Sequence, residues 1–205
     1  MGNRANLVVV DGDEPDIRYG HWAANDLSNH LVLGPAWTES FIRHHESGTW
    51  LDNTWAEGGV AMDPRRRTLI WFDNLSAGDP TWQRLVAHLL SQTWPGWSIS
   101  YAHHGICEIA AAAGVDLGVR RPTFYAVPDD GFVRPLRYVA GYFAALFMHS
   151  HQAFHVLEWQ QIHSALDGPP LDDIFLNRPY GQPTPSFVDL RRVAEHLAIA
   201  LDEAA

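Results

Sequence analysis

The N-terminal half of the chain alternates short apolar runs with turn residues, a pattern typical of paired strands. Residues 7–10 form a β-branched apolar run that suits a buried strand. Residues 11–16 have the composition of a turn, and residues 17–23 are expected to return beside the first strand as a hairpin. The chain therefore begins with a predicted β-hairpin.

The register of this hairpin decides which polar side chains meet at its open end. If Val10 lies opposite Ile17, Asn6 faces His21, and Arg4 faces Ala23 two pairs further along. A β-bulge would shift these pairs. We expect a cluster of polar residues at this end of the hairpin.

A second unit repeats the arrangement. Residues 58–62 and 68–72 are predicted strands joined by a turn, and a helix follows from Pro80, with Asp79 as its N-cap. An equivalent helix is expected from Pro35, after the first hairpin. The pattern predicts two ββα units, which are either a tandem repeat or two similar units without internal symmetry.

Residues 98–101 are a predicted fifth strand, and residues 106–113 a helix ended by Gly114. The expected fold class is α+β, with an antiparallel sheet built from ββα units and a mostly helical C-terminal third. Residues 1–118 form the predicted sheet unit. Residues 119–205 form the helix-rich part, expected to pack on the first as a single globular domain.

Composition narrows the function classes. The chain has 205 residues, 14 basic residues that are all arginine, 24 acidic residues and a formal net charge of −10. This charge argues against nucleic acid and anionic membrane surfaces as partners. No apolar segment has the length of a signal peptide core or a membrane span, so a soluble cytoplasmic protein is expected. A Gly-x-Gly-x-x-Gly motif and a P-loop are both absent, which gives no support to a nucleotide cofactor.

Four segments carry a resemblance. They are 1–6 (MGNRAN), 20–25 (GHWAAN), 55–59 (WAEGG) and 94–97 (WPGW). Together they resemble a family of uncharacterised proteins from high-GC bacteria, over about the first 115 residues. The resemblance implies that this part is one architectural unit, and it implies no function.

The first candidate site is the open end of the hairpin. His21 is the predicted general base, Glu57 its carboxylate partner and His103 a second titrating group, because a carboxylate fixes the tautomer of a histidine beside it. The predicted substrate-binding residues are Arg4, Trp22, Asn25 and Trp55. An arginine there could hold an anion. The alternative is that His21 only caps the sheet edge and that Arg4 pairs with a surface acid.

The second candidate is a metal site in the C-terminal part. On a helix, His151, His155 and Glu158 would share one face, whereas on a strand His149 and His151 would. Imidazole and carboxylate ligands suit a divalent transition metal, the one cofactor that the sequence indicates. The alternative is that these histidines lie on the solvent-exposed face of an amphipathic helix and bind no metal.

The single cysteine and the nine tryptophans add less. Cys107 and His103 would meet only if one helix contained both. That helix is expected to begin near Gly105, after His103, so Cys107 is interpreted as a small core residue. Three tryptophans are predicted to lie in the core: Trp37, Trp71 and Trp82. The other six lie near predicted turns or element ends: Trp22, Trp50, Trp55, Trp94, Trp97 and Trp159.

Two function classes remain. The first is an acid–base enzyme of lyase, isomerase or hydrolase type, either cofactor-independent or metal-assisted, acting on a small polar or aromatic molecule. The second is an acidic binding module, of the immunity or antitoxin kind, that neutralises a basic protein. Convergence of the candidate site residues would favour the enzyme, and a joint surface of exposed tryptophan with the acids of 11–16 and 129–130 would favour the module. The twelve histidines favour the enzyme, and both classes leave homo-oligomers open.

Overall fold

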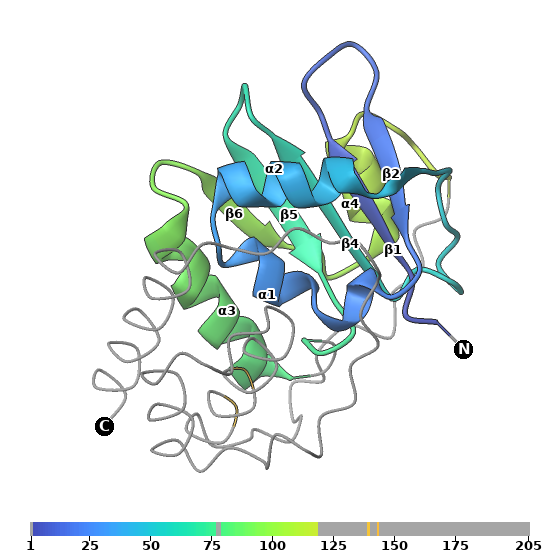
Figure 1. The fold of residues 1–205 in the computed structure, drawn as a ribbon. Helices are drawn as coiled ribbons and strands as arrows, with labels where there is room; N and C mark the ends of the chain where they lie inside the picture. Colours follow the sequence, from blue (N-terminus) through green and yellow to red (C-terminus); the bar gives the residue numbers. More distant parts are fainter. Residues whose placement is uncertain (1, 77–78, 119–138, 140–142, 144–205) are drawn as a thin grey trace, which may run out of the picture.

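Six strands form one sheet with helices on both faces (Figure 1). The computed structural model describes residues 2–76, 79–118, 139 and 143. The strands are β1 (Ala5–Val9), β2 (Asp16–Gly20), β3 (Glu46–Ser47), β4 (Gly58–Asp63), β5 (Thr68–Phe72) and β6 (Ser98–Tyr101). The helices are the 3-10 turn η1 (Ala23–Asn25), α1 (Leu27–Leu31), α2 (Pro35–His44), α3 (Pro80–Thr93) and α4 (Ile106–Ala112).

The fold is α+β, as predicted, and the sheet is mixed. The strand order is β3-β2-β1-β4-β5-β6. Both predicted hairpins, β1–β2 and β4–β5, are antiparallel, whereas β1 pairs with β4 and β5 with β6 in parallel. The expectation of a wholly antiparallel sheet was wrong because helical segments connect the units, and such crossovers return the chain parallel to its neighbour.

The register of the first hairpin differs from the prediction by one step of two residues. Val8, and not Val10, lies opposite Ile17, so Asn6 faces Tyr19 instead of His21. A two-residue change keeps every side chain on its own face of the sheet, so the hydrophobic pattern fits both registers equally well. β2 therefore ends at Gly20, before His21.

The two faces of the sheet are both covered. Ala5, Leu7 and Val9 of β1 belong to the core cluster that α1, α2 and α3 complete, while Val8 belongs to a second cluster with Ile109 of α4. All five residues of β1 are buried. Cover on both faces explains why this strand is a continuous apolar run without alternation.

The tryptophans divide differently from the prediction. Trp71 and Trp82 are buried in the core as expected, and Trp37 packs against it half-buried. Trp94, which the sequence placed at a turn, is 1% exposed, and its Nε1 donates to the carbonyl oxygen of Leu31 at 2.7 Å. This bond satisfies the one polar atom of the indole, and so the ring can lie in the core at the end of α3.

The two ββα units are not related by symmetry. A rotation that exchanges β1 with β4 and β2 with β5 would also exchange the two faces of the sheet. Residues of both α2 and α3 lie in the same core cluster on one face. The recurrence in the sequence therefore reflects two similar units.

The C-terminal part contributes two described residues. Val139 and Phe143 are buried in the larger core cluster, with the Phe143 ring 5.4 Å from that of Trp82. The other elements predicted beyond residue 118 lie outside the described residues. In the described part of the chain, no helix has both the length and the apolar character needed to cross a membrane.

The cap of α3 gives a test of the fold. The Asp79 carboxylate accepts hydrogen bonds from the backbone N–H groups of Thr81 and Trp82, as the sequence predicts. Asp79→Ala should lower the free energy of unfolding by about 1 kcal/mol, measured by urea denaturation. Asp79→Asn, which keeps an accepting oxygen, should lower the free energy of unfolding much less. Equal decreases in the two variants would contradict the capping role.

Candidate functional site

Asn6 fixes a loop that crosses one face of β1 and β2. Its side chain is fully buried inside an otherwise apolar strand. Nδ2 donates to the carbonyl oxygen of Thr49 at 3.0 Å, and Oδ1 accepts from the backbone N–H of Leu51 at 2.8 Å. One amide thus satisfies the backbone of residues 49–51 and holds this loop against the sheet.

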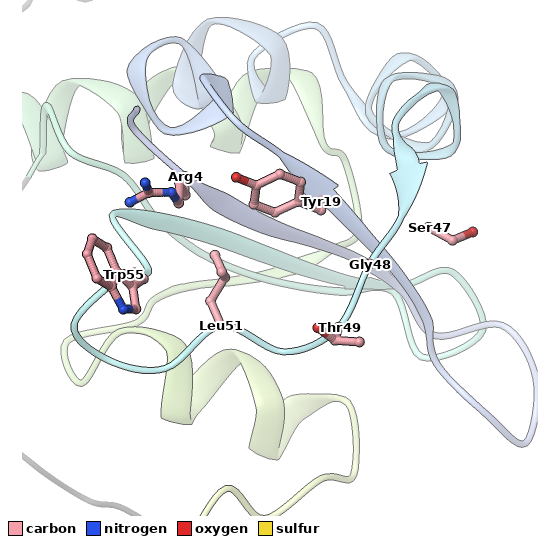
Figure 2. Close-up of a pocket in the computed structure, with 7 residues that line it drawn as sticks. All are labelled: Arg4, Tyr19, Ser47, Gly48, Thr49, Leu51 and Trp55. Carbon is pink, nitrogen blue, oxygen red and sulfur yellow. The ribbon is translucent and has the colours of Figure 1, made fainter. Parts of the chain in front are cut away.

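The loop lies with β1 and β2 around a pocket that is open to solvent and has a volume of about 680 Å³. Its lining residues are Arg4, Tyr19, Ser47, Gly48, Thr49, Leu51 and Trp55. Figure 2 shows Arg4 and Tyr19 near one another over the strands, with Leu51 and Trp55 on the loop. This volume lies within the range of small-molecule sites.

Arg4 is the one charged residue among the described lining residues. Its guanidinium carbon lies 4.7 Å from the centroid of the Trp55 ring, in a cation–π contact. No acid pairs with this guanidinium within the described residues. Arg18 and Arg43, in contrast, both form ion pairs with Asp16. Arg4 therefore keeps its hydrogen-bond donors available for a ligand.

Glu57 lies beside Arg4 but binds its backbone. Oε2 of Glu57 accepts from the backbone N–H of Arg4 at 3.0 Å, and the Arg4 carbonyl oxygen accepts from the backbone N–H groups of Glu57 and Gly58. These bonds continue the parallel pairing of β1 with β4 by one residue. The carboxylate thus anchors the strand start, and no described contact joins it to His21.

His21 pairs with Tyr19 instead. Its Nδ1 lies 2.9 Å from the Tyr19 hydroxyl, and its ring contacts Trp22 edge-on at 5.0 Å. His21 is exposed, and its other side lies so close to Gly2 that a Cβ added there would overlap the ring. Tyr19 lines the pocket and His21 does not, so the pair meets the pocket through Tyr19 (Figure 2). Residues 19 and 21 share a face of the predicted strand 17–23, and this was the signal that could have indicated the pair.

Three further predicted residues, Trp22, Asn25 and His103, do not line the pocket, and Trp22 contacts the ring of His21 instead. Asn25 contacts the side chain of Asn3, next to the backbone bond from Ala24 to Asn3. His103 follows β6, where its ring lies 5.1 Å from that of Tyr101. It lies at the same end of the sheet as His21, but four strand spacings, about 19 Å, separate β6 from β2.

A buried carboxyl group was missed by the sequence analysis. Asp73, directly after β5, accepts from the backbone N–H of Ser76 at 2.7 Å and from the hydroxyl of Ser28 at the start of α1. All three residues are fully buried, and the Ser76 hydroxyl lies 3.0 Å from that of Tyr101. Burial raises the pKa of Asp73, although the hydrogen bonds from both serines oppose the shift. An aspartate that ends a buried strand, with serine three residues later, was the available signal.

The remaining candidates concern metal ligands and the cysteine. His149, His151, His155 and Glu158 lie outside the described residues. Where the structure is described, no group of three or more histidine, cysteine and acidic residues could hold a metal ion. Cys107 lies half-buried in α4, with Sγ 3.6 Å from Oδ1 of Asn53, and packs against the smaller core cluster.

Comparison with family models, curated proteins and solved structures gave no match to this chain. The resemblance to proteins of high-GC bacteria stays a prediction.

The Asn6 amide gives a test of the pocket wall. Asn6→Leu has a similar volume but leaves the backbone groups of Thr49 and Leu51 without their partner, so it should lower the free energy of unfolding by about 2 kcal/mol in urea. Amide hydrogen exchange at Leu51 should accelerate more than exchange in α3. Unchanged exchange at Leu51 would show that the loop does not depend on Asn6.

The pKa of Asp73 predicts a pH dependence. Because its folded-state pKa is raised, the folded protein binds this proton more tightly than the unfolded chain does, and that contribution is lost as pH rises through the folded pKa. Asp73→Asn, which cannot ionise, should therefore gain stability relative to the wild type as pH rises above about 4. Urea unfolding across a pH series measures the difference, with the exposed Asp116→Asn as control. A difference that is constant with pH would contradict the raised pKa.

Proposed function

We propose that this protein is an acid–base enzyme acting on a small anionic molecule held between Arg4, Tyr19 and Trp55. The observation that carries the proposal is the Arg4 guanidinium, which lies over Trp55 in a pocket without an acidic partner among the described residues. In a chain with net charge −10, an arginine has many acids available as partners. The neighbouring carboxylate of Glu57 binds backbone instead, which leaves the cation for a ligand.

The Tyr19–His21 pair supports proton transfer as the chemistry. Tyr19 lines the pocket and would touch the bound molecule, whereas His21 acts through it. When the Tyr19 hydroxyl gives its proton to a carbon of the molecule that carries developing negative charge, His21 can return a proton to Tyr19 from Nδ1. The reverse sequence removes a proton from the molecule. His21 is therefore a relay and positioning residue in this proposal.

The placement of the acids supports a small-molecule site over an acidic binding module. The β1–β2 turn, which carries the acids of 11–16, lies at the opposite end of β1 from Arg4 and its neighbour Trp55, about 20 Å from Arg4 along the strand. Arg43 forms ion pairs with both Asp11 and Asp16, which reduces the negative charge there. The pair at 129–130 lies outside the described residues.

Hydrogen–deuterium exchange of bound ligands tests the proposal without knowledge of the full reaction. A panel of small organic acids is incubated with the protein in D2O, and loss of carbon-bound protons is followed by proton NMR. Wild-type protein should catalyse exchange on at least one compound. Tyr19→Phe should slow it by about 100-fold or more, because the hydroxyl is lost while the ring remains.

Two further variants separate the roles. His21→Gln should slow exchange less than Tyr19→Phe and should change its pH profile, since the relay and not the contacting group is altered. His104 is exposed and lies away from the pocket, so the control variant His104→Gln should catalyse exchange at the wild-type rate. Exchange that is absent in the wild type, or unaffected by Tyr19→Phe, would reject the acid–base role.

A further inference from the structure

We infer that the ligand of the pocket is a monocarboxylate that carries a flat apolar group, the chemistry of an aryl carboxylate. The inference rests on the proposed function for the location of the site, and it adds the class of molecule that binds there. Three features of the pocket lead to it: the single cation among its described lining residues, the apolar surface that it exposes and the position of Arg4 over Trp55.

The charge of the pocket fits one negative charge. Arg4 is the one cation among the described lining residues, and the Glu57 carboxylate lies at its backbone. A phosphate at neutral pH carries nearly two charges and is usually held by several cations or backbone donors. A guanidinium matches a carboxylate with two parallel hydrogen bonds, so a single arginine is sufficient for a monocarboxylate.

The surface beside Arg4 fits a flat apolar group. Trp55 is 53% exposed and is the one large hydrophobic residue exposed in the described part of the chain. Leu51 lies half-buried on the same loop, and the Tyr19 ring faces the pocket from β2 (Figure 2). Large exposed aromatic residues at a pocket indicate a ligand that covers them. A planar ring contacts aromatic surfaces over more area than a branched chain of equal size does.

The contact with Trp55 also positions the guanidinium. Because the guanidinium carbon lies over the indole, 4.7 Å from the ring centroid, the N–H donors of Arg4 are held beside this aromatic surface. A carboxylate that binds those donors places its attached atoms near the uncovered part of Trp55. One ligand can thus use the charge and the apolar surface together.

Calorimetry and tryptophan fluorescence with five probes test the class. Benzoate should bind, and cyclohexanecarboxylate and acetate should bind more weakly. The affinities of benzamide and phenyl phosphate should each be lower than that of benzoate by about tenfold or more. Arg4→Gln should weaken benzoate by about tenfold or more, the usual value of a charged hydrogen bond. Arg65→Gln, an exposed arginine at the far end of the sheet, should not change binding.

Trp55→Ala separates the apolar part from the charge. This variant should weaken the binding of benzoate more than the binding of acetate, because only benzoate has a ring that contacts the indole. Equal or tighter binding of benzamide or phenyl phosphate would overturn the inference, as would unchanged benzoate binding in Arg4→Gln with a wild-type melting temperature.

The binding experiment and the exchange experiment fail independently. Benzoate binding that survives in Tyr19→Phe, with no exchange on any compound in the wild type, supports the ligand class and rejects the enzyme. Exchange confined to aliphatic or doubly charged acids supports the enzyme and overturns the ligand class.

Discussion

The parallel pairing of β1 with β4 is the constraint on which the rest of the structure depends. It places the starts of the two strands side by side, so that the Arg4 backbone forms two hydrogen bonds with Glu57 and one with Gly58. Parallel neighbours cannot be joined by a tight turn, and the chain between them spans residues 10–57. That connection first supplies β2 and two helices of one face, α1 and α2, and then passes over the other face as the loop that Asn6 holds. The pocket is therefore a product of the crossover.

Local patterns predicted the elements well and their lateral order poorly. Hairpins, the Pro80 helix start and its Asp79 cap all follow from residues close in sequence, and the structure shows each of them. Trp94 was misplaced because its position beside a Pro-Gly turn says nothing of Leu31, the distant residue whose carbonyl accepts its N–H. Long-range partners of this kind leave no periodic signal in the sequence.

The same reasoning explains the candidate site. Because strand ends were identified, Arg4, His21 and Glu57 were correctly expected at one end of the sheet. Which of them meet depends on strand order and on a two-residue register step, neither of which hydrophobic alternation encodes. His103 shares that end yet lies across the sheet, whereas Tyr19, unremarked in the sequence, lies in the pocket.

Gly2 limits how the Tyr19–His21 pair can be changed. The imidazole of His21 rests between the Tyr19 hydroxyl on one side and a residue that has no side chain on the other. The smallest addition at position 2, a methyl group, would have to displace either the ring or the backbone. In the proposed mechanism, a substitution at position 2 would therefore alter the relay from a residue that does not line the pocket.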